Sequence, residues 1–323
     1  MFKFLKNKII IKILDNHIIK NCNIFIKIND NKNKLVILDV GGSEGLQNRW
    51  KVFEKHILAI FVEPDKRSYL ELQKKGFKVI TKALWSRETQ KKFYLTNKFQ
   101  TSSLYIPNKR YLNLFPESTR YDIKETLLLD VTTIDNQINS SNQPHFIKLD
   151  IQGAELEVLK GGKNTLRNVM GLEVEINFKE IYEKIPLYND VEKFLKNEGF
   201  ILNDFISLFR WERHNHNNFG EIVHGDMLFL RTPENIIEKS KNLKDPIPMF
   251  ENYIKILFIY NKVDLIIKLS EHLSEENKKT LNLNSTILFL EKNQKKENFL
   301  NTIFAYLKRI IISNDTKFPH WRL

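Results

Sequence analysis

The sequence contains a single cysteine, Cys22, among 323 residues. One cysteine excludes an internal disulfide and suits a reducing compartment, so we expect a cytoplasmic protein. No Cys-x-x-Cys pair or Cys/His cluster is present to indicate a structural zinc ion. We therefore expect no metal site of that kind.

An apolar run long enough to span a bilayer is also lacking. Residues 1–28 are rich in isoleucine and phenylalanine, but Lys12, Asp15 and Lys20 interrupt them. The same charges, with no small-residue cleavage site after them, argue against a secretory signal. We expect no transmembrane segment and interpret residues 1–34 as a basic arm that packs on the next domain; a membrane-surface helix is the alternative.

The net charge of +12 is unevenly distributed. Residues 1–35 hold eight lysines against two aspartates, which is about half of the excess. A basic arm can contact nucleic acid, anionic lipid or an acidic glycan. Codon usage in an AT-rich genome, which favours lysine, asparagine and isoleucine, explains the same composition without a partner.

The most informative stretch is an apolar segment, residues 35–40, that runs into the glycine turn Asp39-x-Gly41-x-x-x-Gly45. The segment predicts a strand buried on both faces. Glycines allow positive φ angles and a close approach of a ligand to the backbone. Residues 47–57 have helical spacing, with Trp50, Phe53 and Ile57 on one side, so the turn is expected to precede a helix amino end.

The next predicted strand, residues 58–62, ends in Glu63-Pro64-Asp65. An acidic residue about 20 positions after the turn is placed to bind ribose hydroxyls. The turn is not Gly-x-Gly-x-x-Gly, and its spacing suits a ligand without a pyrophosphate. Together the two motifs resemble the nucleoside site of class I S-adenosylmethionine-dependent methyltransferases. The alternative is an ordinary junction in another doubly wound protein.

The remaining pattern predicts more of such a sheet. Parallel strands are expected at residues 77–81, 145–150 and 169–176, with helices over 66–75 and 132–138 and another after Glu155. An edge strand at 91–96 and a strand at 126–131 flank a long polar–aromatic loop, residues 99–121. Residues 83–86 follow a strand end where adenine would lie, although Leu84 and Trp85 can equally close the core.

Five segments resemble the FkbM-type methyltransferase family. They are residues 39–45, 62–64, 101–104, 147–161 and 175–182, and the likeness extends over residues 35–232. The resemblance implies a Rossmann-like α/β fold, with a mostly parallel doubly wound sheet and antiparallel end strands. It also implies O-methylation of hydroxyls on sugars or secondary metabolites. Gln152 departs from the glutamate that is frequent at its position, which argues against a metal-bridged substrate site.

This comparison yields the predicted site residues. The predicted S-adenosylmethionine-binding residues are Asp39, Gly41, Gly42, Glu44, Gly45, Glu63, Pro64, Ala83, Leu84 and Asp150. The predicted acceptor-substrate residues are Ser102, Ser103, Tyr105, Arg110, Tyr111 and Tyr182. Asp150, at a strand end beside the nucleoside, is the expected base, with Glu175 as a second carboxylate.

Four other residues, one lysine and three histidines, are interpreted as structural or incidental. We place Lys148 on the opposite strand face and regard it as structural. His214, His216 and His224 lie near the end strands, where one could act as the base, but a histidine in a polar loop is usually incidental.

Two alternative functions remain. An Asp150–Lys179–Glu175 set together with the basic charge suits a ribose 2′-O-methyltransferase acting on RNA. A non-catalytic S-adenosylmethionine-binding module is the other. A sugar, glycan or small-molecule acceptor is preferred to nucleic acid.

Beyond the expected methyltransferase domain (35–232) the sequence changes character. Residues 233–248 are predicted to form a linker, and residues 249–323 an α-helical region with helices at 250–260, 263–273, 285–290 and 299–312. This region carries no catalytic pattern. We expect it to pack on the catalytic domain; self-association through its helices and binding of a partner are the alternatives.

Overall fold

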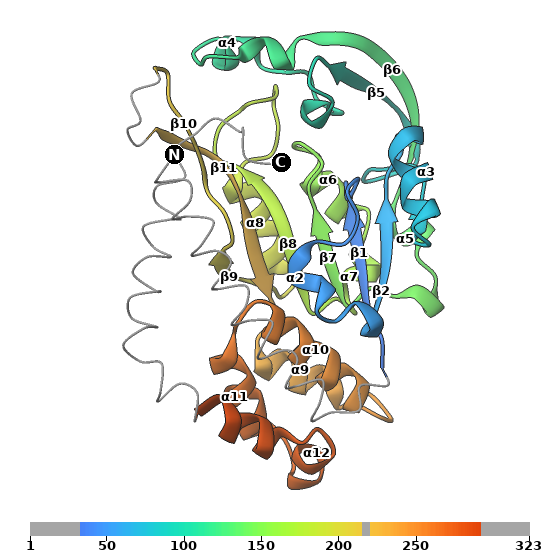
Figure 1. The fold of residues 1–323 in the computed structure, drawn as a ribbon, viewed down its shortest axis with the longest axis vertical. Coiled ribbons are helices and arrows are strands. Elements are labelled where there is room, and N and C mark those ends of the chain that lie inside the picture. Colours follow the sequence, from blue (N-terminus) through green and yellow to red (C-terminus); the bar gives the residue numbers. More distant parts are fainter. Residues whose placement is uncertain (1–32, 215–219, 292–323) are drawn as a thin grey trace. The chain divides into compact units, whose positions relative to one another are not determined.

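The computed structural model describes residues 33–214 and 220–291 (Figure 1). The predicted arm, apart from its last two residues, and the predicted helix at 299–312 lie outside the described residues, as does His216. The described chain forms two compact units. One comprises residues 36–45 and most of 59–230, and the other comprises 33–35, 46–58 and 231–291. The domain boundaries expected from the sequence stay a prediction.

An eight-stranded mixed sheet forms the first unit's centre, and it confirms the predicted α/β class of a mostly parallel sheet with antiparallel end strands. Its order is β10-β11-β8-β7-β1-β2-β3, with β9 paired to β11. The bounds are β1 Leu35–Val40, β2 Ile57–Val62, β3 Lys78–Ile80, β7 Phe146–Leu149, β8 Gly171–Asn177, β9 Ile201–Phe205, β10 Phe209–Trp211 and β11 Glu221–Leu230. β7 pairs in parallel with β1 and β8, whereas β11 runs antiparallel to β8. Every residue of β1, β7 and β8 is buried, as expected for strands covered on both faces.

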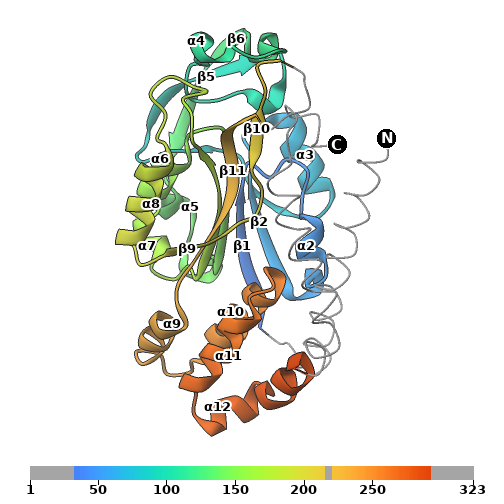
Figure 2. The ribbon, with the colours of Figure 1, turned by 90° about the vertical axis from the view of Figure 1, so that its left-hand side faces the viewer.

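Helices lie on both sides of this sheet, which makes it doubly wound. Figure 2 shows α6 Glu155–Lys160, α7 Lys163–Leu166 and α8 Tyr188–Asn197 on one side and α3 Lys66–Lys74 on the other. A further short helix, α5 Ile134–Gln137, contacts α7. The Asp65 carboxylate caps α3 by accepting hydrogen bonds from the backbone N–H groups of Arg67 and Ser68. Gly76, at φ +82°, follows its end.

A second, three-stranded sheet holds the strands predicted at 91–96 and 126–131. They are longer than expected: β5 spans Thr89–Thr96 and β6 spans Ile123–Thr132, paired antiparallel. β4, Ala83–Leu84, pairs in parallel with the end of β6, so the order is β4-β6-β5 and β5 is an edge strand. The sequence pattern does not reveal that these strands leave the main sheet.

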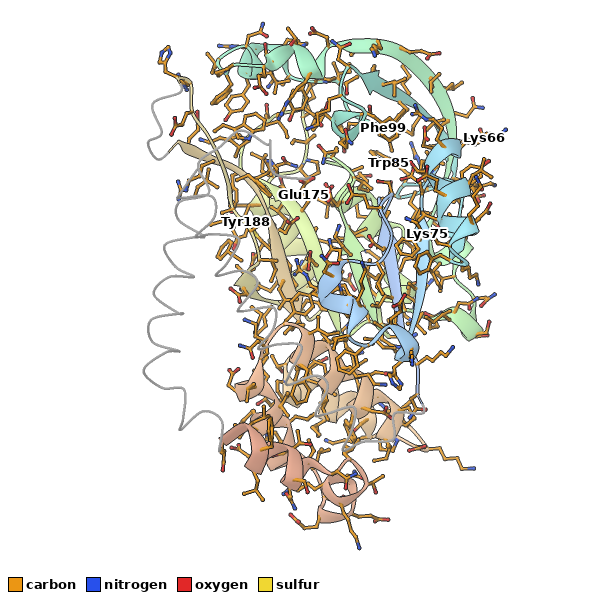
Figure 3. The ribbon with its side chains drawn as sticks, viewed as in Figure 1. Lys66, Lys75, Trp85, Phe99, Glu175 and Tyr188 are labelled. Atoms are coloured by element: carbon orange, nitrogen blue, oxygen red, sulfur yellow. The ribbon has the colours of Figure 1, made fainter. Side chains whose placement is uncertain are left out.

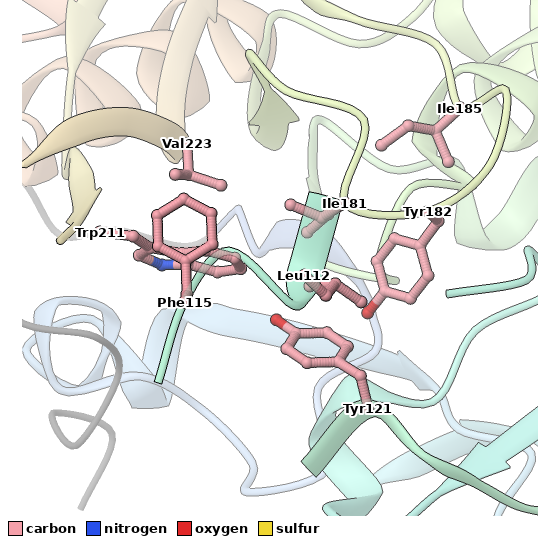
Figure 4. Close-up of a cluster of buried hydrophobic side chains, with 8 residues drawn as sticks. All are labelled: Leu112, Phe115, Tyr121, Ile181, Tyr182, Ile185, Trp211 and Val223. Carbon is pink, nitrogen blue, oxygen red and sulfur yellow. The ribbon is translucent and has the colours of Figure 1, made fainter. Parts of the chain in front are cut away.

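The segment predicted as a loop, residues 99–121, is largely folded. It contains the short helices η2 Phe99–Thr101, α4 Lys109–Leu112 and η3 Ser118–Tyr121. Three of its residues enter an aromatic-rich cluster shown in Figure 4: Leu112, Phe115 and Tyr121, which pack with Ile181, Tyr182, Ile185, Trp211 and Val223. Much of its aromatic content therefore builds a core.

The helix predicted over residues 47–57 is wrong in extent. The structure has one turn, α2 Asn48–Lys51, and then a 3-10 turn, η1 Glu54–His56. Ile57 is the first residue of β2, and no side chain caps α2 at Gln47, so a long helix has neither the residues nor the cap it needs. Trp50 and Phe53 are buried, which explains the apolar spacing.

The second unit is helical after residue 231. It contains α9 Pro233–Ser240, α10 Ile247–Ile259, α11 Val263–His272 and α12 Glu275–Thr280, and residues 283–291 are helical. The predicted helices near 250–260, 263–273 and 285–290 are confirmed. The expected linker, residues 233–248, contains α9. None of the helices in the described ranges is both long and apolar enough to cross a bilayer.

Candidate active site

The glycine turn after β1 lies where three strand ends meet. Gly41 has φ +87°, and its N–H donates to the carbonyl of Val62 at the end of β2 (3.0 Å). A Cβ on Gly41 would lie 2.1 Å from the carbonyl oxygen of Asp150, just past β7. A Cβ on Gly42 would lie 2.7 Å from the Asp39 carboxyl carbon. Gly41 is therefore required both by its conformation and by the close approach of the Asp150 backbone. Gly42 is required only by the close approach of the Asp39 and Phe61 side chains.

A buried charge cluster lies beside this turn. Asp39 of β1 is paired in register with Lys148 of β7, which is paired with Glu173 of β8. Lys148 Nζ lies 4.0 Å from Asp39 Oδ1 and 3.4 Å from Asp150 Oδ2. Burial raises the pKa of Asp39 to about 6, although Lys148 opposes the shift. Burial alone would lower the pKa of Lys148, but Asp150 and Asp39 outweigh it and raise that pKa.

The placement of Lys148 on the opposite strand face is wrong. Residues two apart on a strand share a face, so Lys148 and Asp150 point to the same side. Lys148 is the lysine that contacts Asp150. Lys179, which the RNA hypothesis paired with Asp150 and Glu175, instead forms an ion pair with Glu221 (3.3 Å).

The turn after β7 brings Asp150 and Glu175 together through Gln152. Gln152 and Gly153 both have positive φ, at +60° and +100°. Gln152 Nε2 donates to Glu175 Oε2 at 2.8 Å and lies 3.4 Å from Asp150 Oδ1. Glu175 is near the end of β8, and Figure 3 labels it there. The residue that departs from the family pattern thus bridges the two predicted catalytic carboxylates.

Glu155, which sequence reasoning did not single out, holds this turn. Its Oε1 accepts hydrogen bonds from the backbone N–H groups of Ile151 (2.9 Å) and Gly153 (3.2 Å). Burial, with a further contribution from Glu175, raises the pKa of Glu155 to about 8. The signal available in the sequence was an acidic residue at the start of a helix after a glycine.

Two predicted substrate residues, Ser103 and Tyr182, also support this turn from within the protein, and a third, Ser102, supports the end of β5. Ser103 Oγ donates to the carbonyl of Gln152 (2.7 Å), and the Tyr182 hydroxyl lies 3.0 Å from Gln152 Oε1. Ser102 Oγ accepts a hydrogen bond from the Thr96 N–H (3.1 Å). All three side chains are buried. Their role toward an acceptor stays a prediction.

His224 is the residue that sequence reasoning undervalued. It lies in β11 opposite Asn177, two residues beyond Glu175 in β8. Its Nδ1 is 3.1 Å from Glu175 Oε1, and its ring stacks on Phe209 at 4.6 Å. Only antiparallel pairing brings His224 there, and the register of that pairing is not readable from the sequence.

The predicted ribose carboxylate, Glu63, is buried at the end of β2. Its Oε1 accepts a hydrogen bond from the Asp65 N–H (2.8 Å), and burial raises its pKa to about 7. Pro64 and Glu44 are exposed, and the Glu44 carbonyl lies 3.4 Å from Lys75 Nζ.

The other predicted residues differ in exposure. Gly45 has φ +91°, Ala83 is half-buried and Leu84 is buried. Tyr105 packs against Trp85, with ring centroids 5.7 Å apart.

The last two, Tyr111 and Arg110, belong to α4. Tyr111 packs against Phe115 with ring centroids 5.2 Å apart, and Arg110 is exposed. Over residues 33–214 and 220–291, no three His, Cys, Asp or Glu side chains are grouped so that they could hold a metal ion.

Comparison with known proteins gives one family and several distant structures. A solved structure from Streptococcus pneumoniae, a putative tRNA (m1A22) methyltransferase, is 12% identical, with a TM-score of 0.32. The alignment covers 80% of this chain and 92% of the Streptococcus chain. A putative sarcosine dimethylglycine methyltransferase from Galdieria sulphuraria is 11% identical, with a TM-score of 0.35. That alignment covers 68% of this chain and 85% of the Galdieria chain. Likenesses this remote do not identify a substrate. No curated protein matches the chain.

The family comparison is more specific. The family described as "Methyltransferase FkbM domain" matches residues 39–202, just over half of the chain. The match begins at Asp39, runs through the Asp150–Glu155 turn and includes Glu175. The protein belongs to the FkbM methyltransferase family.

Proposed function

We propose that this protein is an S-adenosylmethionine-dependent O-methyltransferase whose acceptor is a hydroxyl group of a sugar, a glycan or a small metabolite. Family membership supports methyl transfer. The acceptor class rests on one observation, the acidic character of the cluster at the strand ends. Four carboxylates, Asp39, Asp150, Glu173 and Asp226, act on the single buried Lys148.

Residues of the first unit fit the cofactor. Asp39, the glycine turn and Glu63 would hold it, with Ala83 and Leu84 near the adenine. Asp39 Oδ1 is buried and accepts no hydrogen bond from the described residues, so it suits a donor brought by a ligand. The missing side chains at Gly41 and Gly42 allow the Asp150 carbonyl and the Asp39 carboxylate to lie close to the turn. When bound, the cofactor supplies an electrophilic methyl group.

The acceptor hydroxyl must lose its proton as it attacks, so it needs a base. We assign that role to Asp150, which follows β7 beside Gly41. Glu175 fixes the Gln152 amide that approaches Asp150, and it thereby orients the base. His224, held against Glu175, is a second proton acceptor in the same cluster. Separate variants of Asp150 and His224, described below, test which of the two is the base.

Electrostatics favours a neutral acceptor over RNA. A polyanionic backbone is attracted to lysine and arginine and repelled by grouped carboxylates. The candidate site is rich in carboxylates, and Lys179, part of the set expected for an RNA ribose enzyme, is paired with Glu221. RNA nevertheless belongs in the acceptor screen, because the chain as a whole is basic.

The first test is calorimetric titration with S-adenosylhomocysteine. We expect binding to the protein as it is and its loss in Glu63→Ala. Glu71→Ala is the matched control, because it removes the same charge from an exposed position on α3. Absence of binding to the unmodified protein, or equal losses in both variants, would overturn the nucleoside site.

The second test is turnover with sugar, small-metabolite and RNA acceptors. Asp150→Asn should keep S-adenosylhomocysteine affinity while methyl transfer falls by about 100-fold or more. A fall of that size in His224→Asn with an active Asp150→Asn would make His224 the base. Cofactor binding with no transfer to any acceptor class would leave a non-catalytic binding module and refute the enzyme assignment. Transfer to RNA alone would refute the acceptor class.

A further inference from the structure

The outer edge of β6 has no partner strand along most of its length. On one side β6 pairs with β5 from Ile123 to Val131. On its other side β4 pairs only with Val131 and Thr132. In the part of the chain that the structure describes, no strand covers residues 123–130 on this side. Figure 1 shows β6 following the outside of β5.

The backbone groups on this edge can be assigned from the ladder. The carbonyl of Thr132 accepts a hydrogen bond from Trp85 N–H (2.7 Å), on the β4 side. Backbone groups alternate between the two edges of a strand, so those of Asp130, Leu128 and Thr126 point to the same side. They form a row of donors and acceptors, which is a template for another strand.

The exposed side chains of β6 are unusually apolar for an open edge. Leu128 is 62% exposed, Ile123 43% and Leu127 37%. Natural proteins usually protect such an edge with charges, proline, a bulge or a covering element. The pairing of β6 with β5 has a register shift at Lys124, but it is regular from Glu125 to Asp130, and that stretch contains no proline. Apolar residues in this position are expected where a partner strand covers them.

We propose that a second copy of this chain covers this edge, with the two β6 strands antiparallel about a twofold axis at Leu127. In such a pair, the numbers of two facing residues add up to a constant, so the axis fixes every contact. Of the uncovered residues 123–130, the seven from 124 to 130 have Leu127 as their midpoint, and only Ile123 has no uncovered residue opposite it. The two three-stranded sheets would then form one continuous sheet.

Charge complementarity selects this register. With the axis at Leu127, Lys124 of each copy faces Asp130 of the other, and both side chains are exposed. Asp130 Oδ1 is held in place by Gln90 Nε2 (3.0 Å). If the axis were at Thr126, Lys124 would face a leucine instead of Asp130. If it were at Leu128, the partner strand would have to pair with Val131, which already pairs with β4. Opposite charges facing each other stabilise antiparallel strands.

The first experiment measures association and register together, on the full chain with Cys22→Ser as background. Sedimentation velocity should give a dimer at micromolar concentration. Leu127→Cys should cross-link two copies under mild oxidation, because facing Cα atoms lie about 4.5–5.5 Å apart, within disulfide range. Leu128→Cys is the control. It is the more exposed residue, but its copies would be diagonal neighbours about 8 Å apart.

The second experiment is a charge reversal. Lys124→Asp and Asp130→Lys should each raise the dimer dissociation constant about tenfold, because each contact occurs twice. The double variant should restore dimerisation, whereas variants that merely misfold would not be rescued. Unchanged S-adenosylhomocysteine binding checks the fold. The proposal would be overturned by a monomer or by equal cross-linking at the two cysteines. It would also be overturned if neither charge reversal changed the dimer dissociation constant, because the dimer would then form through another surface, such as the C-terminal helices.

Discussion

The side-chain amide of Gln152 donates a 2.8 Å hydrogen bond to Glu175 while its backbone stays at φ +60°. A non-glycine residue in this conformation costs about 1–3 kcal/mol, so its surroundings must hold it there. Glu155 does so through two backbone N–H groups, and Ser103 through the carbonyl of Gln152. The turn is therefore fixed by packing and bonding before any ligand arrives, and this positions Asp150.

Replacing Gln152 by glutamate, the frequent family residue, should destabilise this protein. The new carboxylate would face Asp150 and Glu175 without a donor to offer them. We expect a loss of about 1–3 kcal/mol at pH 8 in chemical denaturation. The repulsion would raise the folded-state pKa of the new carboxyl above its unfolded value, so the loss should shrink at pH 5.

A divalent cation provides the control for that variant. If the added carboxylate completes a cation site, Mg²⁺ should recover stability in Gln152→Glu and leave the unmodified protein unchanged. Stabilisation of the unmodified protein by Mg²⁺ to the same degree would contradict the view that Gln152 disfavours a metal here.

Gly41→Ala should be among the most damaging single changes. The added Cβ would meet the Asp150 carbonyl at 2.1 Å, on top of the strain at φ +87°. Gly76→Ala is the matched control, because φ is +82° but nothing lies within 4 Å of the added carbon. Thermal unfolding should show a modest loss for Gly76→Ala, about 1–2 kcal/mol, and a clearly larger one for Gly41→Ala. Equal losses would mean that the turn relaxes away from Asp150.

The sequence predicts the main sheet well because its strands are strongly patterned. Continuous apolar runs, such as 35–38, and carboxylates at strand ends identified β1, β2, β7 and β8 together with the residues that meet at Asp150. The helix expected at 47–57 failed for a local reason. Trp50 and Phe53 are apolar at helical spacing, but Ile57 belongs to β2. The segment before it therefore forms only two separate turns, α2 and η1.

The polar network was less readable because it depends on pairing register. The contact between His224 and Glu175 requires the antiparallel alignment of β11 with β8, which no local pattern specifies. The role of Lys148 was readable from strand alternation alone. Likewise, apolar alternation gave no sign that β5 and β6 form their own sheet, because a strand pattern does not name its partner.

Lys148→Met should expose how much the cluster depends on one cation. Without it, Asp39 and Asp150 lose the ammonium group that lies within 4.0 Å of both. Removing one partner of a buried ion pair typically costs about 3–5 kcal/mol. Lys160→Met is the control, since Lys160 is exposed and pairs with Glu157, and should cost less than about 1 kcal/mol. Similar values in urea denaturation would show that the cluster is effectively solvated.

Glu63 should make cofactor affinity depend on pH. Burial raises its pKa to about 7, so it is largely protonated at pH 6 and largely ionised at pH 8. A carboxylate accepts ribose hydroxyls better than a protonated carboxyl, so S-adenosylhomocysteine should bind up to about tenfold tighter at pH 8. Glu63→Gln should flatten this dependence in calorimetry.

The stability of the ligand-free protein should fall as pH rises, whereas its affinity for S-adenosylhomocysteine should increase. A carboxyl whose pKa is raised on folding holds its proton more tightly when folded, so its contribution is complete below the unfolded value of 4.5 and is lost as pH rises through about 7. Unfolding free energy should therefore fall between pH 5 and 8, and by less in Glu63→Gln. Because ligand binding favours the ionised form, the increase in melting temperature that S-adenosylhomocysteine produces should be greater at pH 8 than at pH 6. An increase that is independent of pH would mean that Glu63 does not contact the ligand.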